Sequence, residues 1–376
     1  MICIQSITLR KLVLELKEPF EISSARITHR PVFLLEVRDQ SGITVWSEVV
    51  AKGLPNYFPE TIETAWHIIS KFIAPIVVGR SFTDPSDLIH TVNQTIRGNT
   101  MAKAGVEMAA WAIVAEQNNS SLAKHIGGTQ EQIPTGISLG IQDSPEALVA
   151  RVGEAVDDGY HKVKIKIKPG KDLSFLSAVR NKYPDLSIMA DANSAYTLDD
   201  TALLQSMDDL DLLMFEQPLR WDDFLDQSIL QRDLKTPICL DESIANIGHA
   251  KLATHLKSGR IINIKPGRVS GFTDAIAIHD HCRDVGWAVW CGGMLESGVG
   301  RAYNVALASL PHFSIPGDLS PSQRYWKEDI VDPEWTMDEN GYMTVPRDRV
   351  GIGVTVKTDM IESLTEDKLV VDTRTV

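Results

Sequence analysis

The sequence has few cysteines, and none of them forms a closely spaced pair. The four are Cys3, Cys239, Cys282 and Cys291, scattered over 376 residues. Without a C-x-x-C pair, the cysteines give no sign of a metal or redox motif. Cys239 and Cys291 fall in short apolar runs that we interpret as buried strands. We therefore expect reduced thiols in a cytosolic protein.

Long apolar runs and basic surface are also missing. No stretch approaches the roughly 18 apolar residues that a membrane-spanning helix needs, and polar residues interrupt the apolar ones at the N-terminus. The formal net charge is −13, which argues against nucleic acid as a partner because phosphate binding needs basic side chains. These absences predict a cytoplasmic protein that binds neither membrane nor nucleic acid.

Low-complexity segments and linkers are absent too, and the chain is long enough for two domains or one large one. Residues 1–60 carry short β-rich runs, and residues 60–75 and 100–116 have apolar side chains at helical spacing. We interpret residues 1–128 as an α+β domain. A periodic region follows at 129–330. Residues 331–376 break the period, and we expect them to return to the first domain and complete it.

The periodic region is organised around five charged residues at nearly constant spacing. Lys166, Asp191, Glu216, Asp241 and Lys265 lie 25, 25, 25 and 24 residues apart, and each ends a short apolar run. A strand and a helix in about 25 residues form a βα unit, and repeated units predict a parallel sheet. With a first strand at 134–139, a seventh at 286–291 and an eighth at 312–316, the pattern predicts a closed α/β barrel.

The charged residues are expected to meet, because the carboxyl ends of barrel strands share one face. Asp191, Glu216 and Asp241 would bring three hard oxygen ligands together, which suits Mg²⁺ or Mn²⁺. The simpler interpretation, that each acid caps the following helix, is weakened by three successive strands that end in the same way.

Lys164 and Lys166 are two residues apart on one predicted strand, so their side chains point the same way. Lys265 ends a later predicted strand, and three strands lie between the two. A lysine beside a divalent metal and another cation has its ammonium form disfavoured and can act as a base near neutral pH. Two lysines flanking a carboxylate substrate could remove and return the proton α to it, with the metal stabilising the enediolate.

These motifs together resemble the enolase superfamily, in its muconate-lactonising subgroup. The resemblance rests on Lys164-x-Lys166, Asp191-Ala192-Asn193, Glu216-Gln217-Pro218, Asp241-Glu242-Ser243 and Lys265. Residues 263–271, 290–301 and 316–329 are similar to the branch that holds o-succinylbenzoate synthases and N-acylamino acid (N-succinylamino acid) racemases. The resemblance covers nearly the whole chain. It implies a (β/α)7β barrel with a capping domain built from the N-terminus and the C-terminal segment.

The resemblance also implies roles for individual residues. Asp191, Glu216 and Asp241 become Mg²⁺ ligands, and Lys166 and Lys265 the acid and base. In the synthase reaction of menaquinone biosynthesis, Lys166 would take the α-proton and hydroxide would leave the β-carbon. In the racemase reaction both lysines would act. Arg268, one turn after Lys265, would favour proton exchange at that lysine. The remaining residues expected to bind substrate or support the site are Lys164, Asn193, Ser138, Gly293, Met294, Tyr57, Phe20 and Glu242.

Several alternatives stay open at this point. Muconate cycloisomerases share the lysines, although the segment Gly292–Met294 disfavours that reaction. Mandelate-racemase-like members use a histidine where this chain has Trp290 and Cys291, and dipeptide epimerases need two acids where it has only Asp318. A non-catalytic barrel is disfavoured by the intact charged set. The resemblance implies a small carboxylate substrate and a homo-oligomer, and it leaves dehydration and racemisation undecided.

Overall fold

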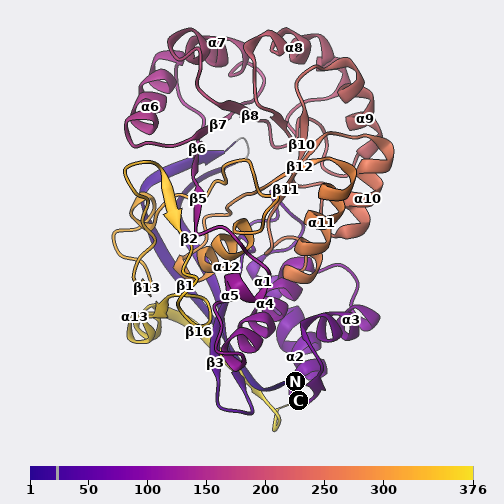
Figure 1. Cartoon of the computed structure of the whole chain (residues 1–376), viewed down its shortest axis with the longest axis vertical. Helices are drawn as coiled ribbons and strands as arrows, with labels where there is room; N and C mark the ends of the chain where they lie inside the picture. The colour runs from indigo at the N-terminus through magenta and orange to yellow at the C-terminus, as the bar shows by residue number, and fades with distance from the viewer. Residues whose placement is uncertain (23–24, 376) are drawn as a thin grey trace.

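The computed structural model describes residues 1–22 and 25–375, and the side chains of residues 20–27 are left aside. The predicted pocket residue Phe20 therefore lies outside the described side chains. The molecule has a parallel barrel surrounded by helices and, beside it, a domain built on an antiparallel sheet (Figure 1).

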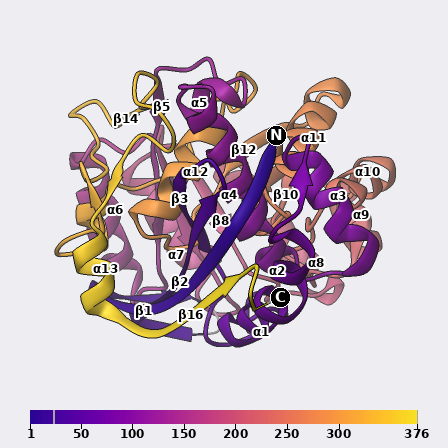
Figure 2. The same ribbon diagram turned by 90° about the horizontal axis from the view of Figure 1, so that it is seen from below.

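The antiparallel sheet of the N-terminal domain has the order β16-β1-β2-β3, and β4 pairs with the start of β1. Its strands are β1 (Ile2–Ile22), β2 (Ala25–Asp39), β3 (Thr44–Val49), β4 (Ser81–Phe82) and β16 (Thr365–Asp372). Seen from below, the C-terminal strand β16 runs alongside β1 (Figure 2). The C-terminal segment thus contributes a strand to the N-terminal domain. The boundaries at 128 and 330 stay a prediction.

The helices of this domain follow β3 in the chain. They are α1 (Ile62–Ile68), the π-helix η1 (Ile69–Ile73), α2 (Ala74–Val77), α3 (Pro85–Thr95), α4 (Thr100–Gln117) and α5 (Leu122–His125). The predicted helix at 100–116 is confirmed as α4, which packs on β2 and β3 and is buried along most of its length. Its many alanines allow this close approach, because they add little bulk between helix and sheet.

The barrel sheet has seven parallel strands in chain order. They are β6 (Gly136–Leu139), β7 (Lys162–Lys166), β8 (Ile188–Asp191), β9 (Phe215–Glu216), β10 (Ile238–Leu240), β11 (Ile261–Ile264) and β12 (Ala288–Cys291). The five evenly spaced charges lie at or just beyond the ends of β7 to β11. The spacing rule is thereby confirmed for the five strands β7 to β11.

The helices of the barrel alternate with these strands and lie outside the ring (Figure 1). They are α6 (Pro145–Asp157), α7 (Leu173–Lys182), η2 (Leu198–Asp200), α8 (Thr201–Ser206), η3 (Asp208–Leu210), α9 (Phe224–Asp233), α10 (Ile247–Leu256), α11 (Phe272–Val285) and α12 (Gly298–Ala308). Ser144 caps α6 by accepting a hydrogen bond from the Ala147 amide, with Pro145 in the first turn.

The predicted eighth strand at 312–316 is not a regular strand. Phe313 makes an isolated parallel bridge to Val289 of β12, and Gly317 makes one to Thr135, next to β6. The amide of Asp318 donates to the Cys291 carbonyl at 3.2 Å, and the Gly317 carbonyl accepts from Gly136 at 2.6 Å. An irregular segment therefore joins the two edges of the sheet. Pro316 lacks the N–H that a continuous ladder would need there.

Short elements complete the chain after the barrel. They are η4 (Ser322–Arg324), β13 (Val331–Asp332), β14 (Tyr342–Thr344), β15 (Thr355–Val356) and α13 (Thr358–Leu364). β14 pairs with β5 (Gln132–Pro134), just before the first barrel strand, and β13 pairs with β15. Asn340-Gly341 lies just before β14, and β14 pairs with β5 instead of with the segment that precedes these two residues.

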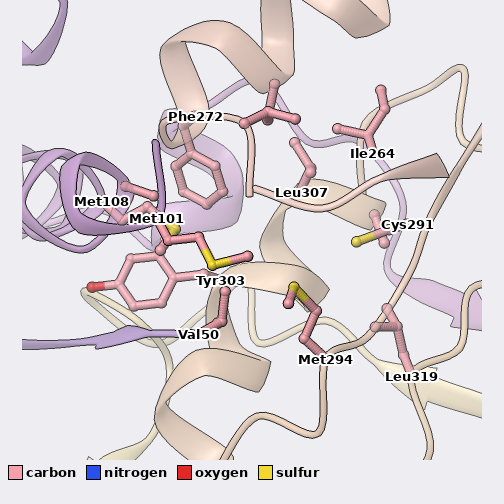
Figure 3. Packing of buried hydrophobic residues seen from close by; sticks show 14 of the residues in the cluster. Val50, Met101, Met108, Ile264, Phe272, Cys291, Met294, Tyr303, Leu307 and Leu319 are labelled. Carbon is pink, nitrogen blue, oxygen red and sulfur yellow. The ribbon is translucent and has the colours of Figure 1, made fainter. Parts of the chain in front are cut away.

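The two domains share one hydrophobic core. Figure 3 shows Val50, just after β3, beside Tyr303 of α12 and close to Met294 of the barrel, with Met101 and Met108 of α4 near Phe272 of α11. This shared core holds the loop after β3 over the carboxyl ends of the barrel strands. Among the described residues, no helix is both long enough and apolar enough to cross a membrane.

Candidate active site

Strand β7 points three lysines to the same side of the sheet, because side chains alternate along a strand. Lys164 and Lys166 line a pocket at the carboxyl end of the barrel. Lys162 lies deeper and is fully buried, with its ammonium 3.6 Å from the centre of the Trp290 ring. This cation–π contact makes Lys162 part of the barrel interior, a role that sequence reasoning did not predict.

Lys164 is the centre of an ion-pair network. Its ammonium lies 2.6 Å from Asp318, 3.0 Å from Glu216 and 3.2 Å from Asp191. Burial opposes the ammonium form, but the Asp318 and Glu216 carboxylates raise the pKa of Lys164 well above its ordinary value. Lys164 is therefore held as a cation. This favours a role as a fixed positive charge over that of a base.

Asp318 was missed as a site residue by sequence reasoning. Burial opposes its ionisation, but Lys162 and Lys164 together lower the pKa of Asp318 to about 2. The residue follows the irregular eighth segment and faces β7 across the closed barrel. The sequence feature that could have identified Asp318 as a site residue is its position just after the last strand of the predicted barrel.

The three predicted metal ligands occupy neighbouring strand ends. Asp191 is directly opposite Glu216 in the β8–β9 pairing, and Asp241 directly follows β10, the next strand. Their exposed fractions are 1%, 0% and 1%. Burial, together with the neighbouring Asp191 charge, raises the pKa of Glu216 to about 8. Buried carboxylates that disfavour one another in this way require positive charge nearby.

In this conformation, lysine and arginine side chains supply that charge. Lys166 lies 2.6 Å from Asp191, Lys265 lies 2.8 Å from Asp241, and Arg268 is also paired with Asp241. Within the described part of the chain, no group of three His, Cys, Asp or Glu side chains is arranged to hold a metal ion. The oxygen donors and their adjacent strand positions nevertheless fit Mg²⁺ or Mn²⁺ in ligand type.

Lys166 is 9% exposed and faces the pocket. Besides Asp191, its ammonium donates to the Asn193 side-chain oxygen at 2.6 Å. Asn193 in turn donates to Glu242 at 2.8 Å. Burial and the nearby Asp241 charge raise the pKa of Glu242 to about 7. Two residues expected to support the site, Asn193 and Glu242, thus form one chain of contacts that orients Lys166.

Lys265 approaches the pocket from the end of β11, which three strands separate from β7. Its ammonium donates to the Tyr57 hydroxyl at 2.9 Å and to Asp241 at 2.8 Å. Arg268 is fully buried and donates to the same hydroxyl at 3.0 Å. Burial opposes the charged form of Lys265, but Asp241 and Tyr57 raise its pKa. Tyr57 therefore links the capping domain to the second lysine.

The pocket contains several of the predicted substrate-contacting residues. Its lining comprises Lys52, Tyr57, Ser138, Lys164, Lys166, Asn193, Lys265, Gly293, Met294, Leu295, Asp318 and Tyr325. A Cβ atom at residue 293 would lie 2.6 Å from the Asp318 carbonyl oxygen, so only glycine fits there without a shift of backbone. Lys52, Leu295 and Tyr325 are lining residues that sequence reasoning did not single out.

The turns that follow β8 and β9 hold the carboxylates in place. Asn193 and Gln217 have positive φ values of 44° and 41°, which is uncommon for residues other than glycine and often marks functional sites. The Gln217 side-chain oxygen accepts from the amides of Asp241 and Ser243 at 3.0 and 3.3 Å. Asn263 donates to Glu216 at 2.7 Å. The side-chain amides of Gln217 and Asn263 therefore restrain the ends of three adjacent strands, β9, β10 and β11.

The sequence of the chain matches two models of known protein families. Residues 147–360 match the model described as "Enolase C-terminal domain-like", and residues 4–127 match "Mandelate racemase / muconate lactonizing enzyme, N-terminal domain". The chain belongs to the enolase superfamily. The resemblance inferred from the charged strand ends is thereby confirmed, together with the barrel and capping-domain architecture.

Relatives within the superfamily are similar over nearly their whole length. An "o-succinylbenzoate synthase" from Bacillus subtilis is 46% identical over 361 residues, 96% of each chain. An "N-succinylamino acid racemase" from Thermus thermophilus is 42% identical, over 96% of this chain and 97% of the relative. A solved enolase-superfamily structure from Listeria innocua matches with a TM-score of 0.95 and 41% identity, covering 99% of this chain and 100% of that one.

Proposed function

We propose that this enzyme is an o-succinylbenzoate synthase of menaquinone biosynthesis, which removes a proton and hydroxide from a small carboxylate substrate. The observation that carries the proposal is a single pocket faced by two lysines from strands on different sides of the ring, Lys166 and Lys265. Each lysine is paired with a different buried carboxylate. The 46% identity to a relative of that name supports the same reaction.

The reaction divides the work between the two lysines. The Lys166 amine accepts the proton α to the substrate carboxylate at its Nζ atom and then gives this proton to the hydroxide that leaves the β-carbon, which departs as water. Lys265 keeps its proton and stabilises the negative charge that builds up on the carboxylate. Lys164, held as a cation by Asp318 and Glu216, adds fixed positive charge from the barrel floor.

Asp191, Glu216 and Asp241 would hold Mg²⁺ or Mn²⁺. When bound, the ion supplies Lewis-acid stabilisation to the substrate carboxylate. Asp191 and Asp241 also pair with Lys166, Lys265 and Arg268, so the residues that would hold the ion also position both lysines.

A direct measurement tests the metal ligands. Calorimetric titration with Mg²⁺ is expected to show one ion per chain, and Glu216→Gln to abolish that binding because an amide is a poor ligand for a hard cation. Glu242→Gln is the matched control, since Glu242 neighbours the same site but contacts Asn193. No binding by the wild-type protein at millimolar Mg²⁺, or equal loss in both variants, would contradict the ligand assignment.

Racemisation of N-succinylamino acids is the second candidate function, alone or in the same enzyme. It needs a lysine on each face of the α-carbon, and the presence of both Lys166 and Lys265 in the lining of one pocket supports this candidate. Arg268 shares Asp241 with Lys265, so its positive charge disfavours a second ammonium beside it. A relative named as such a racemase is 42% identical. Muconate cycloisomerisation, which uses the same lysines, has no further observation in its favour.

The deciding experiment compares both reactions in one preparation. With Mg²⁺ present, kcat/KM is measured for dehydration of the hydroxylated cyclohexadiene carboxylate precursor and for racemisation of an N-succinylamino acid. We expect dehydration to dominate. Comparable or greater racemisation would make the enzyme bifunctional or a racemase, and failure of both reactions would overturn the substrate class. We also propose that the enzyme acts in the cytoplasm and that it forms a homo-oligomer.

A further inference from the structure

Lys52 is a pocket lysine that the proposed reaction does not use. It lies just after β3, on the capping-domain segment that leads to Tyr57, and it is half-buried. Its backbone carbonyl accepts from the Ile62 amide at 3.0 Å, which ties the segment to the start of α1. Its ammonium lies 4.9 Å from the centre of the Tyr57 ring, and the Lys265 ammonium lies 4.8 Å from the same centre.

Lys52 differs from the other three pocket lysines in its partners. Lys164 is paired with Asp318, Lys166 with Asp191 and Lys265 with Asp241. The contacts made by the described side chains give Lys52 no ion pair and no hydrogen bond, only the face of Tyr57. A half-buried ammonium with only an aromatic face as its partner is incompletely compensated.

The surroundings of Lys52 are rich in positive charge. Burial, followed by the charges of Arg30, Lys166 and Lys265, lowers the pKa of Lys52 to about 7, although the Glu242 charge acts in the opposite direction. Among the described residues that line the pocket, Asp318 is the one acid, and it is already paired with Lys162 and Lys164. The capping side of the pocket therefore favours an anionic group supplied by a ligand.

The proposed substrates carry such a group at their far end. Both the hydroxylated cyclohexadiene precursor of o-succinylbenzoate and an N-succinylamino acid have two carboxylates, one at the ring or the α-carbon and one at the end of the succinyl chain. The first must lie near Lys166 and Lys265 for proton transfer. The second then needs another cation, and Lys52 is the lining lysine that comes from the capping domain instead of from a barrel strand.

We infer that Lys52 binds the terminal carboxylate of the succinyl group and so makes the enzyme selective for dicarboxylic substrates. This inference rests on the proposed function, which it extends from the reacting carbon to the substrate's tail. A neutral acyl chain of equal length would leave Lys52 without its anion. Such a site discriminates by leaving its own charged group unpaired with the wrong ligand.

The test replaces Lys52 by methionine, which keeps the length of the chain and removes the charge. Turnover is compared for an N-succinylamino acid and for the N-butanoyl derivative of the same amino acid, which has a methyl group in place of the terminal carboxylate. We expect Lys52→Met to lower the succinyl-over-butanoyl ratio of kcat/KM by about 10- to 100-fold, the usual range for a lost charged hydrogen bond. The loss should be mainly in KM.

Two further variants sharpen the result. Lys52→Arg keeps the charge and is expected to restore part of the ratio. Lys71→Met removes an exposed lysine from the same domain and should leave the ratio unchanged. An equal loss for both substrates would overturn the inference and point to a role in holding Tyr57. An unchanged ratio in Lys52→Met would overturn it as well.

A binding measurement separates this inference from the reaction itself. Calorimetry compares o-succinylbenzoate with o-butanoylbenzoate on wild-type protein and on Lys52→Met. A preference for the dicarboxylate that disappears in Lys52→Met supports the inference even if neither reaction is catalysed. No preference in the wild-type protein refutes it even if turnover is fast. Failure of the proposed function would instead appear as absent turnover with both acyl chains.

Discussion

Lys166→Ala is expected to lower kcat for dehydration and for racemisation by at least about 1,000-fold, in the upper range for loss of a general base. Both reactions begin with removal of the same α-proton, and Lys166 is held toward the pocket by Asp191 and Asn193. Loss of both activities together is the distinguishing result. It is measured with each substrate at saturation, in Mg²⁺.

The same variant should change thermal stability little, because Lys164 remains within 3.2 Å of Asp191 and still compensates its charge. Lys182→Ala, on the exposed end of α7, is the matched control and should retain full activity. Exchange of the substrate α-proton with deuterated solvent gives a second measurement. Exchange at the wild-type rate in Lys166→Ala would mean that another group is the base.

Lys265→Arg is expected to reduce racemisation by about 100- to 1,000-fold and dehydration by about tenfold, since general acid–base catalysis contributes 10²- to 10⁴-fold. Arginine keeps the positive charge that stabilises the developing negative charge, but its pKa is too high for it to exchange a proton. Asp241 and Tyr57 already hold Lys265 as a cation against the effect of burial. A permanent cation therefore suits dehydration and fails where a second base is required.

The comparison needs both assays on one preparation of the variant. Lys251→Arg, on the exposed side of α10, controls for the chemical change alone. Arginine is bulkier than lysine, so circular dichroism and Mg²⁺ binding should be compared with wild type. Equal losses in the two reactions would contradict the division of work between Lys166 and Lys265. A greater loss in dehydration would reverse the proposed roles.

The sequence by itself determined the barrel and the identity of its charged strand ends. A strand and its helix need about 25 residues, so the even spacing of Lys166, Asp191, Glu216 and Asp241 was enough to predict repeated βα units in a parallel sheet. Parallel strands in register then place consecutive strand ends side by side, as the pairing of Asp191 with Glu216 shows. These are local and periodic properties, which a linear sequence contains in full.

The tertiary structure decided the contacts that depend on distant segments. Asp318 reaches Lys164 only because an irregular segment closes the ring. Tyr57, whose ring also contacts Lys52, reaches Lys265 because a shared core docks the capping domain over the strand ends. Such pairings join residues about 150 to 210 positions apart, and no spacing rule encodes them. Packing of the two domains therefore completes the pocket that the strand ends begin.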